Sequence, residues 1–122
     1  MAFVFVCLGA AVGAPLRYLV DRSVQGRRDG VFPWGTLTVN VVGSLALGLL
    51  AAVAVGRDLP EGVWLALGPG FCGAFTTWST LGYETLRLYA DGAHRLALAN
   101  VGASLALGLS AASVGYLIGS LV

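Results

Sequence analysis

The sequence contains no lysine, only one histidine and two cysteines, and few charged residues of either sign. Charged residues make up 11% of its 122 positions, whereas soluble domains carry about 25%. The net charge of +1 and the lack of a basic patch argue against nucleic-acid binding. No histidines, cysteines and carboxylates have the spacing of a metal site, and no nucleophile–base arrangement occurs. The sequence therefore predicts no enzyme, no catalytic residues and no nucleic-acid partner.

Hydrophobic residues are abundant instead, at 57% of the chain with a mean hydropathy of +0.85. Because a membrane-spanning helix needs about 20 apolar residues, four spans would use most of the chain. We predict an all-α membrane protein with a single domain over residues 1–122, multi-pass in the cell membrane and in contact with lipid. The spans are predicted at about residues 2–21, 33–55, 62–89 and 95–121. Cys7 and Cys72 fall inside them and are expected to be packing thiols.

Two of these spans carry pairs of small residues spaced four positions apart. Gly9 and Gly13 lie in the first span, and Gly115 and Gly119 lie in the last. Such pairs let another helix approach closely, because no side chain separates the two backbones. Each pair therefore predicts a helix–helix contact.

The third span is predicted to be broken near its middle. The segment Gly70–Thr80 contains two glycines three positions apart, followed by several hydroxyl side chains. Glycine loosens a helix, and irregular backbone within a membrane is tolerated only where protein or a water-filled cavity covers it. A break here favours an ion or substrate site. The alternative is a flexible helix whose hydroxyls bond the carbonyl one turn earlier.

Three spans each carry a narrow polar stripe, formed by residues four positions apart on one helix face. The stripes consist of Thr36, Asn40 and Ser44, of Thr76, Thr80 and Glu84, and of Asn100 and Ser104. Serine and threonine can bond their own backbone, but the mid-span carboxamide of Asn40 cannot satisfy all its groups locally. Asn40 either faces a polar bundle interior or bonds helices together.

The chemistry of these stripes favours a small anion as the solute. The predicted membrane centre holds hydroxyl and amide donors, but no arginine and no carboxylate. Cation pathways usually carry acidic rings, and proton-coupled carriers need a titratable group at mid-depth. Neutral donors and the positive edges of aromatic rings suit an anion stripped of water.

Three motifs in these spans resemble the Fluc (CrcB-type) fluoride channels of bacteria. They are GA-x-x-GA-x-x-RY from Gly9, WGTL-x-VNV-x-GS from Trp34, and GFCGAFTT-x-ST from Gly70. The resemblance touches all four spans in order. It implies a fluoride-specific channel that exports fluoride passively and so reduces its toxicity. It also implies an antiparallel, dual-topology dimer with two pores and a structural, untransported sodium ion at the dimer centre.

The resemblance also implies individual roles. The backbone carbonyls of Gly73 and Thr76 would hold the sodium, with both copies of the chain contributing, since hard cations take oxygen ligands. Asn40 would donate a hydrogen bond to fluoride.

The remaining pathway residues implied by the resemblance are Thr80 and Ser104 in a polar track and Arg17 at a vestibule. Glu84 matches an acidic position that the family often has. At the positions of Trp78 and Leu81 the family usually has phenylalanines, whose ring edges line the pores. Trp78 keeps an aromatic edge, but Leu81 does not, so conduction through both pores of a self-dimer is in question.

Two alternative functions stay open at this point. One is a non-conducting partner subunit of a heterodimeric fluoride channel, which the departure at Leu81 keeps possible. The other is a proton-coupled small multidrug transporter, which is also built from four short spans in a dimer. Those carriers have a glutamate in the first span, whereas this chain has no acidic residue before Asp21.

The arginines are distributed unevenly between the predicted connections. Arg57 lies alone on one side, and the other six arginines lie towards the opposite side. Basic connections stay cytoplasmic, so the sequence predicts one orientation with both termini outside. A dual-topology protein needs near balance. We therefore expect an antiparallel dimer with an oppositely biased paralogue, the alternative being a dimer of the chain with itself.

Overall fold

A computed structural model describes all of residues 1–122 and contains only helices. Three helices are long and apolar enough to cross a membrane. They are α1 (Ala2–Gly26), α2 (Trp34–Gly56) and α6 (His94–Leu121). The third hydrophobic segment is divided into α3 (Glu61–Leu65), a π-helical stretch η1 (Ala66–Cys72), α4 (Gly73–Phe75) and α5 (Trp78–Ala90). The prediction of an all-helical membrane protein is confirmed.

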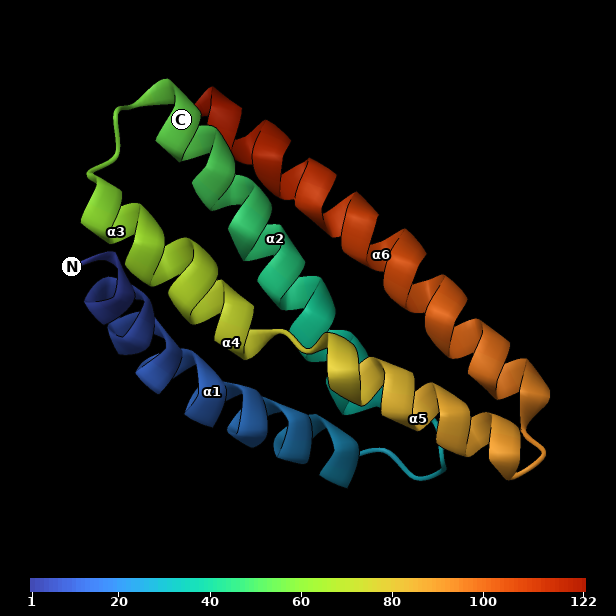
Figure 1. Ribbon diagram of the computed structural model, residues 1–122. Helices are drawn as coiled ribbons and strands as arrows, with labels where there is room; N and C mark the ends of the chain where they lie inside the picture. The colour runs from blue at the N-terminus through green and yellow to red at the C-terminus, as the bar shows by residue number, and fades with distance from the viewer.

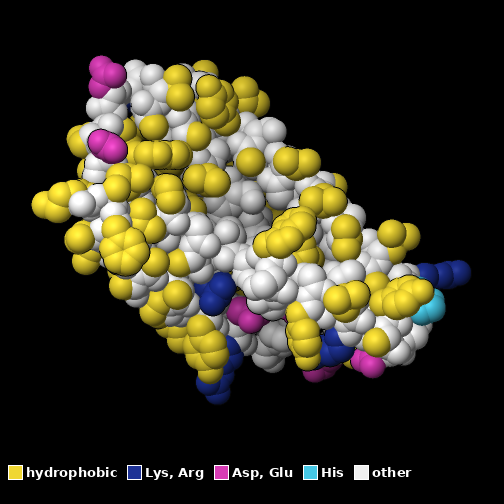
Figure 2. All heavy atoms as spheres, in the orientation of Figure 1, with side chains coloured by type: hydrophobic (Ala, Val, Ile, Leu, Met, Phe, Trp, Pro, Cys, Tyr) yellow, Lys and Arg dark blue, Asp and Glu magenta, His cyan; other side chains and the backbone are white.

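The four hydrophobic segments run up and down beside one another and are joined by short connections (Figure 1). α2 packs along α6, α1 packs against η1 and α4, and α5 packs against α6. Both chain termini lie at one end of the bundle, opposite the α1–α2 and α5–α6 connections (Figure 1). Charged side chains gather mostly towards the end with these two connections, whereas the visible long sides are largely apolar (Figure 2).

The small-residue pairs lie where helix backbones touch. α2 lies against Gly115 and Gly119, and η1 lies against Gly9 and Gly13. At each of these four glycines an added Cβ would collide with a backbone carbonyl oxygen of the neighbouring helix. The bundle can therefore close at these points only because the side chain is a hydrogen atom.

The third segment leaves helical geometry at two consecutive threonines. Thr76 (φ −85°, ψ 164°) and Thr77 (φ −150°, ψ 121°) are extended, and they form the thin yellow segment between α4 and α5 in Figure 1. The glycines do not form this break, contrary to the reason given for predicting it. Gly73 is helical (φ −62°, ψ −39°). Gly70 instead allows α1 to pack closely, since an added Cβ would lie 2.7 Å from the Val6 carbonyl oxygen.

The first helix continues beyond the predicted end near residue 21, as far as Gly26. The side chain of Gln25 accounts for this extension. Its Nε2 donates to the carbonyl oxygen of Phe32 (3.2 Å), and its Oε1 accepts from the amide of Gly35 (3.2 Å). The last turn of α1 is thereby held against the start of α2, whose first amides have no helical acceptor of their own.

Candidate ion site at the helix break

Asn40 on α2 pairs with the backbone of Thr77 through both ends of its carboxamide. Asn40 Nδ2 donates to the Thr77 carbonyl oxygen (3.0 Å), and the Thr77 amide donates to Asn40 Oδ1 (2.7 Å). A carboxamide nitrogen carries two hydrogens, so one N–H of Asn40 is left for a ligand. The side chain therefore joins α2 to the break and keeps a free donor.

This pairing and a second bond at the break remove the helical partners of two carbonyl groups. In an uninterrupted helix the Thr77 amide would bond the Gly73 carbonyl, and the Thr80 amide would bond the Thr76 carbonyl. Here the Thr77 amide bonds Asn40 (2.7 Å), and the Thr80 amide bonds the Thr77 hydroxyl (3.3 Å). The carbonyls of Gly73 and Thr76 thus lose the donors that a continuous helix would supply.

Four of the predicted pathway residues meet in one open cavity of about 290 Å³ between α2, the break and α6. These residues are Asn40, Trp78, Leu81 and Ser104, and Thr76 also lines the cavity. The Ser104 hydroxyl is buried and has no hydrogen-bond partner in the chain. Trp78 is 77% exposed and Leu81 is 6% exposed. Ser44 and Thr77 also line the cavity, whose wall is otherwise made of glycine and apolar residues.

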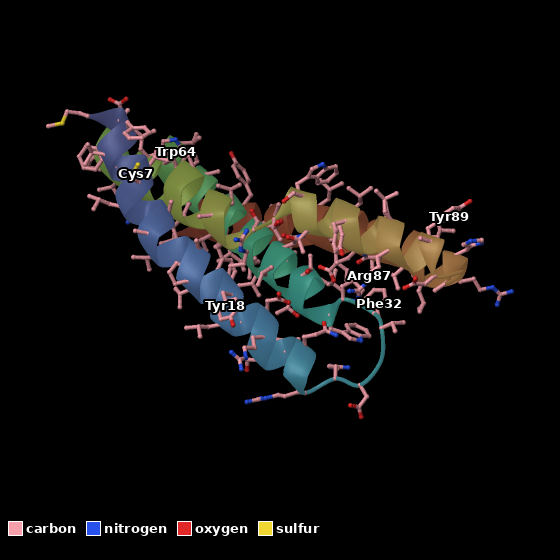
Figure 3. The ribbon with its side chains drawn as sticks, turned by 60° about the horizontal axis from the view of Figure 1, so that its bottom comes forward. Cys7, Tyr18, Phe32, Trp64, Arg87 and Tyr89 are labelled. Atoms are coloured by element: carbon pink, nitrogen blue, oxygen red, sulfur yellow. The ribbon has the colours of Figure 1, made fainter.

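Arg17 and Thr80 lie elsewhere, in a second cavity of about 170 Å³. Its lining consists of Arg17, Tyr18, Asp21, Thr36, Val39, Thr77 and Thr80. In Figure 3 the start of α2 lies between α1, which carries Tyr18, and α5, which carries Arg87. Thr77 lines both cavities. The break therefore lies between the two cavities, of which the second contains both an arginine and an aspartate.

Thr77 had no expected role from the sequence, although it is central to the site. Its hydroxyl accepts from the Thr80 amide (3.3 Å) and donates to Thr80 Oγ1 (3.0 Å). This is an N-cap arrangement, in which a threonine just before a helix bonds an amide of the first turn. The residue type carried a signal for this role, because threonine is a favoured N-cap residue and Thr77 directly precedes the first residue of α5.

Two polar stripe residues, Glu84 and Asn100, lie outside both cavities and take part in bonds between helices. The Thr36 hydroxyl donates to the Glu84 carboxylate, which connects α2 with α5. Asn100 is fully buried and donates from Nδ2 to Thr85 Oγ1 (2.9 Å), which connects α6 with α5. The Asn100 Oδ1 atom has no partner. These contacts correspond to polar bonding between membrane helices.

The donors and acceptors at the break differ in what they can hold. The free N–H of Asn40 and the hydroxyl of Ser104 are neutral donors suited to a small anion. The carbonyls of Gly73 and Thr76 are oxygen acceptors suited to a hard cation. No group of three or more histidines, cysteines and carboxylates could hold a metal ion. A cation at this site would therefore use backbone oxygens.

These features define a small multi-pass membrane protein of helices only, with an interrupted third segment between two cavities. Residues 4–116 match the family described as CrcB-like protein, Camphor Resistance (CrcB). The chain belongs to this family, which confirms the resemblance found from its motifs.

Similar proteins from three organisms are named as ion channels. A Frankia casuarinae protein named Fluoride-specific ion channel FluC 1 is 53% identical over 122 residues, covering 94% of this chain and 93% of its own. A Streptomyces avermitilis protein of the same name is 54% identical over 115 residues, with coverage of 94% and 93%. A Mycobacterium bovis protein named Fluoride-specific ion channel FluC 2 is 49% identical over 110 residues, with coverage of 90% and 84%. Channel relatives confirm that this chain is not an enzyme.

Proposed function

We propose that this chain is a fluoride channel subunit through which fluoride leaves the cell passively. The observation that carries the proposal is the pair of unbonded neutral donors, on Asn40 and Ser104, that line one largely apolar cavity. Such donors can replace part of the water around a small anion without a titratable group. Close relatives named as fluoride-specific ion channels indicate fluoride as that anion.

A structural sodium ion is part of the proposed assembly. The Gly73 and Thr76 carbonyls have lost their helical donors, and oxygen ligands suit a hard cation. Two carbonyls per chain are few ligands for a hard cation, since hard cations such as calcium and magnesium take about six or more oxygens. A second chain that contributes the same two carbonyls would bring the ion closer to a full set, and Gly73 is exposed on the surface of the single chain.

The proposed assembly is an antiparallel dimer, with a paralogous subunit favoured over a second copy of this chain. Trp78 lines the cavity that it shares with Asn40, and its side chain is exposed on the surface of the single chain. A second chain packed there would cover Trp78 and complete the cavity wall. Relatives carry the numbered names FluC 1 and FluC 2, which fits a pair of related subunits. The arginine bias towards one end of the bundle supports the same arrangement.

We expect fluoride efflux from loaded liposomes to follow the fluoride gradient and to be unchanged by an imposed proton gradient. The physical reason is that no titratable side chain lines the larger cavity. Efflux is measured with a fluoride electrode, for this chain alone and together with a paralogue. Efflux that strictly requires proton movement would favour the transporter alternative instead. Activity only in the presence of the paralogue would support the proposed heterodimer over a dimer of identical chains.

A second prediction concerns orientation in the membrane. Cysteines introduced singly at Asp29 and Gly56, in a Cys7→Ala background, probe opposite ends of the bundle; both positions are exposed, and Cys72 is buried. Gln25 is unsuitable because it caps α2. With a fixed orientation, a membrane-impermeant reagent applied to whole cells should label the cysteine at position 56 and spare the one at position 29. Comparable labelling of both would contradict the fixed orientation and support a dimer of identical chains.

A further inference from the structure

We infer that Asn40 is a positioning residue for the sodium site, so that one side chain couples the anion pathway to the cation site. The inference rests on the sodium site, which is part of the proposed function. The bond that carries the inference is the one from the Thr77 amide to Asn40 Oδ1 (2.7 Å). This bond occupies the donor that a continuous helix would direct at the Gly73 carbonyl.

The geometry of the break shows why a carboxamide is needed at this position. Thr77 is extended, so its N–H does not bond the carbonyl four residues earlier as it would in a continuous helix. Asn40 satisfies both groups at once, through Oδ1 and Nδ2. Without such a partner, the Thr77 amide would stay unsatisfied within the membrane, which is unfavourable. The chain could relieve this by returning the Thr77 amide to the Gly73 carbonyl.

The second carbonyl is kept free by an independent bond. The Thr77 hydroxyl accepts from the Thr80 amide (3.3 Å), which would otherwise bond the Thr76 carbonyl. The two carbonyls are therefore kept free by different groups, the side chain of Asn40 for Gly73 and the side chain of Thr77 for Thr76. Asn40 also lines the cavity proposed for fluoride, and Thr77 lines both cavities.

The coupling predicts that sodium affinity changes when Asn40 is altered, independently of any effect on fluoride. In Asn40→Ala, the sodium concentration needed to reach a given rise in the unfolding midpoint should increase by about tenfold or more, an energy of about 1.4 kcal/mol. The measurement is the thermal unfolding midpoint of the purified dimer, with sodium titrated against N-methylglucamine at constant ionic strength. Ligand that binds only the folded state raises this midpoint, so fluoride transport is not needed for the readout.

Three further variants separate positioning from a general loss of structure. Asn40→Asp keeps an oxygen acceptor for the Thr77 amide, and its sodium dependence should lie closer to that of the parent than Asn40→Ala does. Thr77→Val frees the Thr80 amide and should weaken sodium binding by a similar factor. Ser104→Ala removes a donor from the same cavity without touching the break, so it should leave sodium dependence unchanged. If Asn40→Ala does not fold, the comparison of Asn40→Asp with Thr77→Val and Ser104→Ala provides the test.

The outcomes distinguish this inference from the proposed function. Sodium dependence that is the same in the parent, Asn40→Asp and Asn40→Ala overturns the inference, even if Asn40→Ala stops fluoride efflux. A parent protein whose unfolding is indifferent to sodium overturns both the inference and the sodium site, while its fluoride efflux still tests the channel. A parent that binds sodium through Asn40 but carries no fluoride supports the inference and contradicts the channel.

Discussion

Asn40→Ala is expected to slow fluoride efflux by about a hundredfold or more. A polar group buried without its partner costs about 2–7 kcal/mol, and each 1.4 kcal/mol corresponds to about tenfold. The mutation removes the N–H available to the anion and both bonds that hold the Thr77 backbone. Initial efflux rates from liposomes, normalised to the amount of folded protein, give the measurement.

Thr38→Val is the matched control for this effect. It also replaces a polar side chain of α2 with an apolar one, but the Thr38 hydroxyl bonds only the Trp34 carbonyl one turn earlier (2.8 Å). Its efflux should stay close to that of the parent. If Asn40→Ala folds and conducts at the parent rate, the carboxamide is a helix connector with no part in permeation.

The second large effect is expected at the contact between α2 and α6. In Gly115→Val the added Cβ would collide with the Leu45 carbonyl oxygen. Backbone cannot move aside as a flexible side chain can, so the helices must separate. Overpacking costs about 1–3 kcal/mol and occasionally more, and we expect a value at or above the top of that range. Denaturant unfolding in mild detergent measures the loss of stability.

Gly73→Val provides the contrasting result. An added Cβ at Gly73 meets no atom within 4 Å in the single chain, and the residue has helical dihedral angles. The chain should therefore keep its helical content, whereas the dimer should dissociate if this face meets a second chain. Size-exclusion chromatography with light scattering separates the two effects. A dimer of normal stability in Gly73→Val would contradict the placement of Gly73 at the dimer centre.

The local pattern of the sequence was sufficient for the membrane class and for the polar stripes. Long apolar runs require helices, since membrane lipid offers no partner for unpaired backbone groups. The four-residue spacing of polar positions places them on one helix face. The spacing thus selected Asn40 and Ser104 as stripe residues, and the family resemblance added Trp78 and Leu81 as pathway positions. All four line one cavity. The glycine pairs likewise predicted close helix contacts.

Spacing along one helix says nothing about how neighbouring helices are rotated and offset against each other, and the tertiary structure sets these relations. Packing at Gly9 and Gly115 brings the helix backbones together. In this arrangement the Asn40 side chain bonds the Thr77 backbone in addition to lining the cavity. The arrangement also leaves Gly73 helical and places the extended geometry at Thr76 and Thr77. The break forms there because Asn40, 37 positions away, bonds the Thr77 backbone in place of the helix, a partnership that sequence spacing cannot reveal.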